Sequence, residues 1–428
     1  MMKSAALTLT LLILGAFPAY AYTDKNAGYS INDHNPEAIV RSSNLYAFTD
    51  QSENSIAVHT YTAAEVEALT GVKFSTDVFL QEYEKLALLQ RSQLSLKTLP
   101  IPLLEIAKYQ QDEHKIFLSA NTVDQEANIR IDKLNKLHVI TLCYPANEEN
   151  MLSYVSFASA NDMLYIITFW SNNVIDGENS AKADTDIWQQ YWQSLRTFKT
   201  SKPIQSEDKK LQYYDAINKN TVDLPADWVY AQTNFKDKYD QGCLTVSLPL
   251  STMRGLIKII QQNLNVKSID DVQENVDAVL ASNMAIFASK EILQQEKQTG
   301  EKIIANLDET LVTASLKVKD SNCKEWFVQP EATQIEFAAI LEHSLQRLKY
   351  FNDEYFTLKD YEYFANVNSK KALLKLNSNI SLYKQYNFNT SVQVCCTPKD
   401  KMNFLLYLNK QDKPQQLNIA DVQAAWQF

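Results

Sequence analysis

Glycine is scarce in this chain. Its 428 residues include seven glycines, and one of them, Gly15, lies in an apolar segment at the N-terminus. Loops that hold phosphate groups need several glycines close together, because the backbone must approach the ligand and adopt positive φ angles. No two of the seven are near neighbours. The sequence therefore argues against a nucleotide-binding loop, and we expect no cofactor.

Clusters of basic residues are also lacking. The chain has 41 lysines and arginines against 51 aspartates and glutamates, which gives a net charge of -10. Binding a polyanion requires grouped positive charges that neutralise its phosphates. A diffuse acidic surface instead favours solubility. We therefore expect no nucleic-acid partner.

The familiar catalytic signatures are missing. The sequence has no GxSxG nucleophile elbow, no SxxK joined to a KTG, and no HExxH or CxxC motif. His34 and His114 stand beside carboxylates, but adjacent residues in a strand or loop usually diverge, whereas metal ligands must converge. A pairing of Cys143 with His138 stays open, since tertiary contacts are invisible in a sequence. We assign no catalytic, cofactor-binding or metal-ligating residue and favour a protein without enzymatic activity.

The five cysteines allow two disulfides at most, since an odd number leaves one thiol unpaired. Cys395 and Cys396 are adjacent in a predicted strand, where neighbouring side chains point to opposite faces. One interpretation is that the cysteines are small buried residues. The other is a bridge from Cys243 or Cys323 to one of the adjacent pair.

A long apolar run occurs only at the start. Lys3 supplies a basic beginning, an apolar core follows over residues 6–17, and Ala19-Tyr20-Ala21 has the small residues of a cleavage site. The run contains no cysteine that could accept a lipid, and no later segment is long enough to span a membrane. We expect a mature chain that begins at Tyr22 and is exported to the periplasm or the outside. It would be soluble, not a lipoprotein, and without a membrane-spanning segment after cleavage.

The remaining sequence has the composition of a globular protein, with 45% hydrophobic and 21% charged residues. A strand, a tight turn, a second strand and an aromatic helix run from Leu152 to Phe198, and a shorter version recurs over residues 390–428. In the first copy, Trp188 and Trp192 repeat at helical spacing, which predicts that this helix packs on a sheet. Earlier in the chain, Thr62 and Glu65 form a capping box, and Gly71 marks the end of that helix.

These patterns predict an α+β protein. We expect two tandem α/β/α-sandwich-like modules, each with a mainly antiparallel sheet and a C-terminal helix packed on it. The hypothesis that the second module is a diverged duplicate of the first rests on the repeated pattern alone. The expected divisions are a signal peptide over 1–21, the first module over 22–199, a polar linker over 200–210 and the second module over 211–428.

Two phrases carry a resemblance to a known family. LYAFTDQSENSIAV (Leu45–Val58) is similar to the early strand, acidic turn and second strand of the Mog1/PsbP-like family, which includes exported bacterial modules of the DcrB type. LPADWV (Leu224–Val229) is similar to that family's opening phrase. The resemblance implies an α/β/α sandwich around an antiparallel sheet and a role in binding or assembly, with no shared catalytic set. The predicted long helical stretch Ser268–Gln298 departs from the family pattern in the second module.

An aromatic and acidic segment between Tyr350 and Phe364 is the candidate binding site. Aromatic rings offer stacking area and carboxylates offer directional acceptors, so a sugar or a cationic peptide would fit. The alternative is that half of the rings fill the core while the acids face water. The predicted ligand-binding residues are Tyr350, Tyr355, Tyr361 and Tyr363.

Taken together, the sequence favours an exported, non-enzymatic protein that binds a protein partner or a small ligand at the cell envelope. Two alternatives stay open. One is a hydrolase with an unrecognised active site, and the other is a carbohydrate-binding surface protein.

Overall fold

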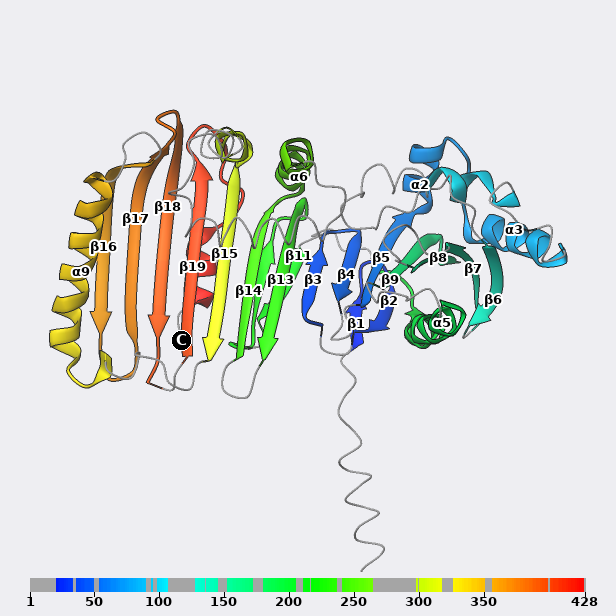
Figure 1. The fold of residues 1–428 in the computed structure, drawn as a ribbon, viewed down its shortest axis with the longest axis horizontal. Helices are drawn as coiled ribbons and strands as arrows, with labels where there is room; N and C mark the ends of the chain where they lie inside the picture. Colours follow the sequence, from blue (N-terminus) through cyan, green and yellow to red (C-terminus); the bar gives the residue numbers. More distant parts are fainter. Residues whose placement is uncertain are drawn as a thin grey trace, which may run out of the picture. The chain divides into compact units, whose positions relative to one another are not determined.

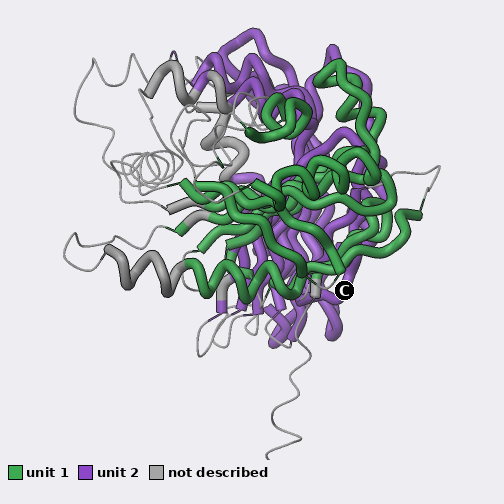
Figure 2. The backbone as a smooth tube through the Cα atoms, turned by 90° about the vertical axis from the view of Figure 1, so that its right-hand side faces the viewer, with its two compact units in different colours: residues 1–37, 44–207 green, residues 38–43, 208–428 purple. Residues whose placement is uncertain are grey.

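The structure, a computed structural model, divides into two compact units. Unit 1 comprises residues 1–37 and 44–207, and unit 2 comprises residues 38–43 and 208–428 (Figure 2). The described residues are 21–33, 36–49, 54–89, 94, 98–106, 128–134, 136–144, 152–171, 180–204, 211–215, 217–236, 241–264, 298, 300–317, 326–350, 356–398 and 401–426. The expected module boundaries at 22–199, 200–210 and 211–428 stay a prediction.

Unit 1 is organised around a six-stranded antiparallel sheet of order β4-β5-β9-β8-β7-β6 (Figure 1). The predicted hairpin is present, since β8 and β9 pair from Leu152 with Ser171 to Ala160 with Met163. The strands are β4 (Leu45–Thr49), β5 (Asn54–Thr62), β6 (Asn128–Leu134), β7 (Leu137–Tyr144), β8 (Leu152–Ala160) and β9 (Met163–Ser171).

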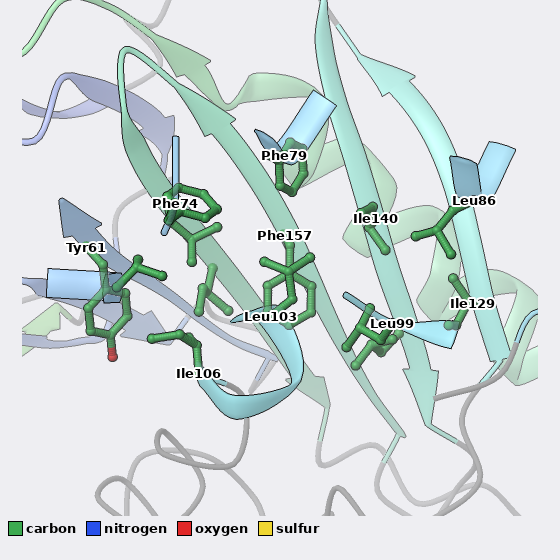
Figure 3. Close-up of a cluster of buried hydrophobic side chains, with 14 of the residues drawn as sticks. Tyr61, Phe74, Phe79, Leu86, Leu99, Leu103, Ile106, Ile129, Ile140 and Phe157 are labelled. Carbon is green, nitrogen blue, oxygen red and sulfur yellow. The ribbon is translucent and has the colours of Figure 1, made fainter. Parts of the chain in front are cut away.

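Helices α2 (Ala63–Thr70) and α3 (Thr76–Leu88) cover one face of this sheet. The capping box at Thr62 and Glu65 is formed, and Gly71 ends α2 with φ 70°, a conformation that glycine adopts without strain. Figure 3 shows Phe157 in the middle of the core, with Phe79 and Leu103 beside it. Each fully buried side chain of this kind contributes roughly 1.5–3 kcal/mol through removal from water.

Helix α5 (Ser180–Thr197) and a small sheet of order β1-β2-β10 belong to the opposite face. Tyr191 of α5 is fully buried and stacks on Tyr154 of β8, with ring centroids 5.2 Å apart. Its hydroxyl shares a hydrogen bond with Ser156, so the aromatic face of the helix is also fixed by a polar contact. The small sheet consists of β1 (Ala21–Asp24), β2 (Tyr29–Asn32) and β10 (Lys199–Thr200).

Unit 2 contains an eight-stranded antiparallel sheet of order β16-β17-β18-β19-β15-β14-β13-β3. Its strand β3 comes from residues 38–41, which precede the rest of the unit by a long stretch of sequence. It is antiparallel to β13, with Arg41 opposite Tyr230 and Ala38 opposite Thr233. The strands are β3 (Ala38–Arg41), β13 (Trp228–Lys236), β14 (Gln241–Pro249), β15 (Glu309–Lys317), β16 (Phe356–Val367), β17 (Ala372–Leu382), β18 (Tyr386–Cys396) and β19 (Lys401–Lys410).

One face of this sheet is packed by the hairpin β11 (Leu211–Asp215) and β12 (Asn220–Leu224) and by helix α10 (Ile419–Ala425). Trp426, directly after α10, is 1% exposed and lies against Tyr213, with ring centroids 6.1 Å apart. The carboxylate of Glu309 on β15 is buried here and accepts hydrogen bonds from the Tyr407 hydroxyl and from two backbone N–H groups.

On the other face, α6 (Leu250–Leu264) packs on β13 and β14, and α9 (Pro330–Tyr350) packs along β16. Cys396 is disulfide-bonded, whereas Cys143 and Cys243 are free thiols. Because Cys243 is a free thiol, it is not the disulfide partner of Cys396. The other predicted partner, Cys323, lies outside the described residues.

The α+β class, the antiparallel sheets and the packed closing helices are thus confirmed. The closing hairpin β8–β9 is followed by α5, whose Tyr191 stacks on Tyr154 of the sheet, and the hairpin β18–β19 is followed by α10, after which Trp426 packs into the core of unit 2. Among the described residues, no helix is long and apolar enough to cross a membrane.

The buried position of Trp426 leads to a stability prediction. We expect Trp426→Ala to lower the free energy of unfolding of unit 2 by about 3–5 kcal/mol, because a large side chain is lost and a cavity is left. Urea denaturation measures the loss. The control Ile335→Ala removes a side chain of the same unit that is 71% exposed, and it should change stability by less than about 0.5 kcal/mol. Equal effects of the two substitutions would contradict the packing described.

Candidate functional site

Two of the four tyrosines of the predicted binding segment, Tyr361 and Tyr363, have described side chains. Tyr361 and Tyr363 lie on the same side of β16, while Tyr350 ends α9 and Tyr355 lies outside the described residues. Tyr361 is half-buried and packs on a cluster with Leu358, and Tyr363 is 36% exposed. The assignment of these tyrosines to ligand binding stays a prediction.

Two acidic residues of the same segment, Asp360 and Glu362, lie on the opposite side of the strand. The register of β16 with β17 shifts between Leu358 and Asp360, and from there Asp360, Glu362 and Phe364 share one face. Asp360 and Glu362 are exposed, and the Phe364 ring is 51% exposed. Within β16, this face therefore carries two carboxylates and one phenyl ring, whereas Tyr361 and Tyr363 lie on the other face.

The pairing of Cys143 with His138 is not formed. Both residues belong to β7 and are five positions apart, so their side chains point to opposite faces. Burial raises the pKa of the Cys143 thiol to about 12, which keeps it protonated and poorly nucleophilic at neutral pH. Burial, aided by Lys133, lowers the pKa of His138. Among the described residues, no group of three His, Cys, Asp or Glu side chains is placed to hold a metal ion.

An apolar pocket lies in unit 1, between α3 and the turn at residues 98–103. Its volume is about 340 Å³. The Ser75 side chain accepts a hydrogen bond from the backbone N–H of Val78 and so caps the start of α3. On the other side, the Pro100 carbonyl accepts the N–H groups of Leu103 and Leu104 and begins a short helical turn. The lining residues are Val72, Phe74, Val78, Phe79, Glu82, Thr98, Leu99, Pro100, Ile101, Pro102 and Leu103.

Two polar residues, Glu82 and Thr98, interrupt this apolar lining. The Glu82 carboxylate accepts a hydrogen bond from Lys85 Nζ at 2.5 Å, in a pair that is largely exposed. Ile101, at the same pocket, is 64% exposed. The pocket can therefore take an apolar group and offer an acceptor to a polar end of the same ligand. Sequence reasoning missed this site; its signal was the unusual density of apolar residues around Pro100 and Pro102.

Comparison with known proteins finds resemblance only at the level of fold. No family model and no curated protein matches the chain. A cyanobacterial PsbP from Synechocystis resembles it with a TM-score of 0.25 and 14% identity, covering 44% of this chain and 95% of its own. A protein of Bacteroides thetaiotaomicron gives a TM-score of 0.22 and 8% identity, covering 68% of this chain and 81% of its own. The likeness is one of fold. The predicted resemblance to PsbP-like modules is confirmed as a likeness of fold.

The raised pKa of Cys143 predicts its reactivity. Only the thiolate reacts with iodoacetamide, and at pH 8 a thiol of pKa about 12 is ionised in roughly one molecule in ten thousand. We expect alkylation of Cys143 in the folded protein to be at least a hundredfold slower than in the urea-unfolded chain, measured by mass spectrometry. Comparable rates in the two states would contradict the burial of this thiol.

Proposed function

We propose that this chain is an exported, non-enzymatic protein that binds a small ligand with an apolar body through the pocket of unit 1. The observation that carries the proposal is the pocket itself. Its volume of about 340 Å³ lies within the usual range of small-molecule sites, roughly 300–1,000 Å³. Its lining has the composition common at such sites, namely mostly apolar side chains with a few polar groups.

The chemistry of the lining suggests which ligands fit. Contact with Val78, Leu99 and Leu103 removes apolar ligand surface from water, which contributes about 25 cal/mol for each Å² buried. Glu82 can accept a hydrogen bond from a cationic or hydroxyl end group. Its present ion pair with Lys85 is exposed, and exposed pairs contribute less than about 1 kcal/mol, so exchange for a ligand costs little. The favoured ligand is therefore a short chain or ring with a hydrogen-bond donor at one end.

Export is supported by the start of the fold. Tyr22, the expected first residue of the mature chain, belongs to β1 and stacks on Tyr46 with ring centroids 3.5 Å apart. The Tyr46 hydroxyl in turn donates to Asp33 at 2.6 Å. A chain cut after Ala21 would therefore keep this anchor. The disulfide at Cys396 agrees with a destination outside the cytosol, because structural disulfides persist in oxidising compartments.

The ligand proposal predicts a charge preference. Decylamine should bind more tightly than decanoate in isothermal titration calorimetry, because its ammonium group can meet Glu82 while decanoate would be repelled. Val78→Trp should fill the pocket and weaken decylamine binding by at least tenfold. Leu69→Trp, at an exposed position of α2 outside the pocket, is the control and should leave binding unchanged. Glu82→Gln should remove the preference between the two probes. Binding that survives Val78→Trp, or no binding of either probe, would reject the proposal.

The export proposal is tested separately. When the full chain is expressed in a bacterium with two membranes, we expect it in the periplasm or medium with Tyr22 as its first residue, determined by N-terminal sequencing. Ala21→Arg should block cleavage, because the processing enzyme requires a small residue there. Recovery of the uncleaved chain in the cytosol would contradict export and leave the pocket proposal untouched.

A further inference from the structure

Five polar side chains form a row across unit 2. In β15, β19, β18, β17 and β16, register partners follow one another from strand to strand, so their side chains share one face of the sheet. Neighbouring strands lie about 4.8 Å apart, which sets the spacing along the row. The row consists of Glu309, Asn409, Asn389, Asn379 and Asp360.

The row changes from buried to open along its length. Glu309 is 2% exposed and its carboxylate is fully engaged by Tyr407 and the backbone. Asn409 is 5% exposed, and its Oδ1 has no hydrogen-bond partner among the described residues. Asn389 and Asp360 are exposed. The closed end is thus held rigidly, and the next position carries a buried acceptor that a donor would satisfy.

Gln411 indicates what kind of group the row accepts. Its side chain is exposed, and its Nε2 donates to Oδ1 of Asn389 at 3.1 Å and to Oδ1 of Asn379 at 3.3 Å. One polar group thereby contacts two neighbouring amides. The Nδ2 groups of these two asparagines make no hydrogen bond within the described structure, so each amide still offers a donor beside its acceptor.

The surroundings of the row suit an uncharged ligand. The next row on this face pairs Glu362 with Asn377 and Ser391, and the Ser391 hydroxyl donates to Asn377 at 2.8 Å. Beyond it, Phe364 is paired with Lys375. Acidic and basic groups therefore occur together, with amides and a hydroxyl between them, and the Phe364 ring adds an exposed apolar surface.

We propose that this face of β16, β17 and β18 binds an extended, neutral glycan whose sugar rings run across the strands along the row. Sugar hydroxyls both donate and accept, which matches amides and carboxylates, and the C–H faces of sugars pack on an aromatic ring. The strand spacing is close to the length that one pyranose adds to a β-1,4-linked chain. A peptide is the weaker fit, because extended peptides bind along an open strand edge through backbone groups. The site belongs to unit 2 and is independent of the pocket in unit 1.

Affinity as a function of ligand length tests this proposal. We expect β-1,4-linked gluco-oligosaccharides, measured by isothermal titration calorimetry on the mature full chain, to bind more tightly up to roughly four sugar units and then level off, as set by the strand spacing. Malto-oligosaccharides of equal length, whose α-1,4 linkages curve the chain, should bind at least tenfold more weakly. Failure of cellotetraose to bind, or equal affinity for maltotetraose, would overturn the proposal.

Substitutions locate the binding. Asn389→Ala and Asn379→Ala should each weaken cellotetraose binding at least tenfold, whereas Gln411→Ala should strengthen it, because a competing side chain leaves the row. Ser378→Ala, next to Asn379 but on the opposite face of β17, is the matched control, and circular dichroism checks that each variant folds. Unchanged affinity in both asparagine variants would overturn the proposal, as would an extended Ala-Ser peptide that binds at this row in place of the glycan.

Discussion

The alternation of side chains along a β-strand is the constraint on which most of this structure depends. Successive residues face opposite sides of a sheet, so one position decides whether a side chain joins a core or meets water. The adjacent cysteines follow this rule: Cys396 lies in the cluster beside α9, while Cys395 is paired with Asn403 and Leu373 on the other face. In β17 and β18 the same rule places Ile380 and Phe388 in an apolar cluster on one face and Asn379 and Asn389 on the other.

Local signals made much of the fold predictable. The capping box of Thr62, the αL glycine at Gly71 and the alternating hairpin β8–β9 each act within a few residues, and each is formed as the sequence indicates. The aromatic helix α5 could also be placed, because its ring-bearing residues repeat at helical spacing. Non-local features could not be found in this way. The pairing of β3 with β13 joins segments that are far apart in the chain, and no local pattern encodes it.

The arrangement of side chains around the predicted binding segment was not predictable, for the same reason. The sequence led to the prediction of a binding segment between Tyr350 and Phe364, and it left open which of the side chains there would face water. A β-bulge at position 359 shifts the register of β16 with β17, and it thereby determines which face of the sheet each later residue of β16 occupies. No composition or spacing rule reveals such a bulge. The pocket in unit 1 depends on the meeting of α3 with a proline-rich turn, which is a tertiary event.

The strand β3 has a consequence for how such a protein can be inherited and rearranged. Unit 2 is not encoded by one uninterrupted piece of gene, since residues 38–43 precede the remainder of the unit by almost the whole of unit 1. A recombination event that moved only the later coding segment would leave part of β13 unpaired, and bare strand edges recruit other chains into aggregates. We therefore expect the coding segments of the two units to be inherited and rearranged together.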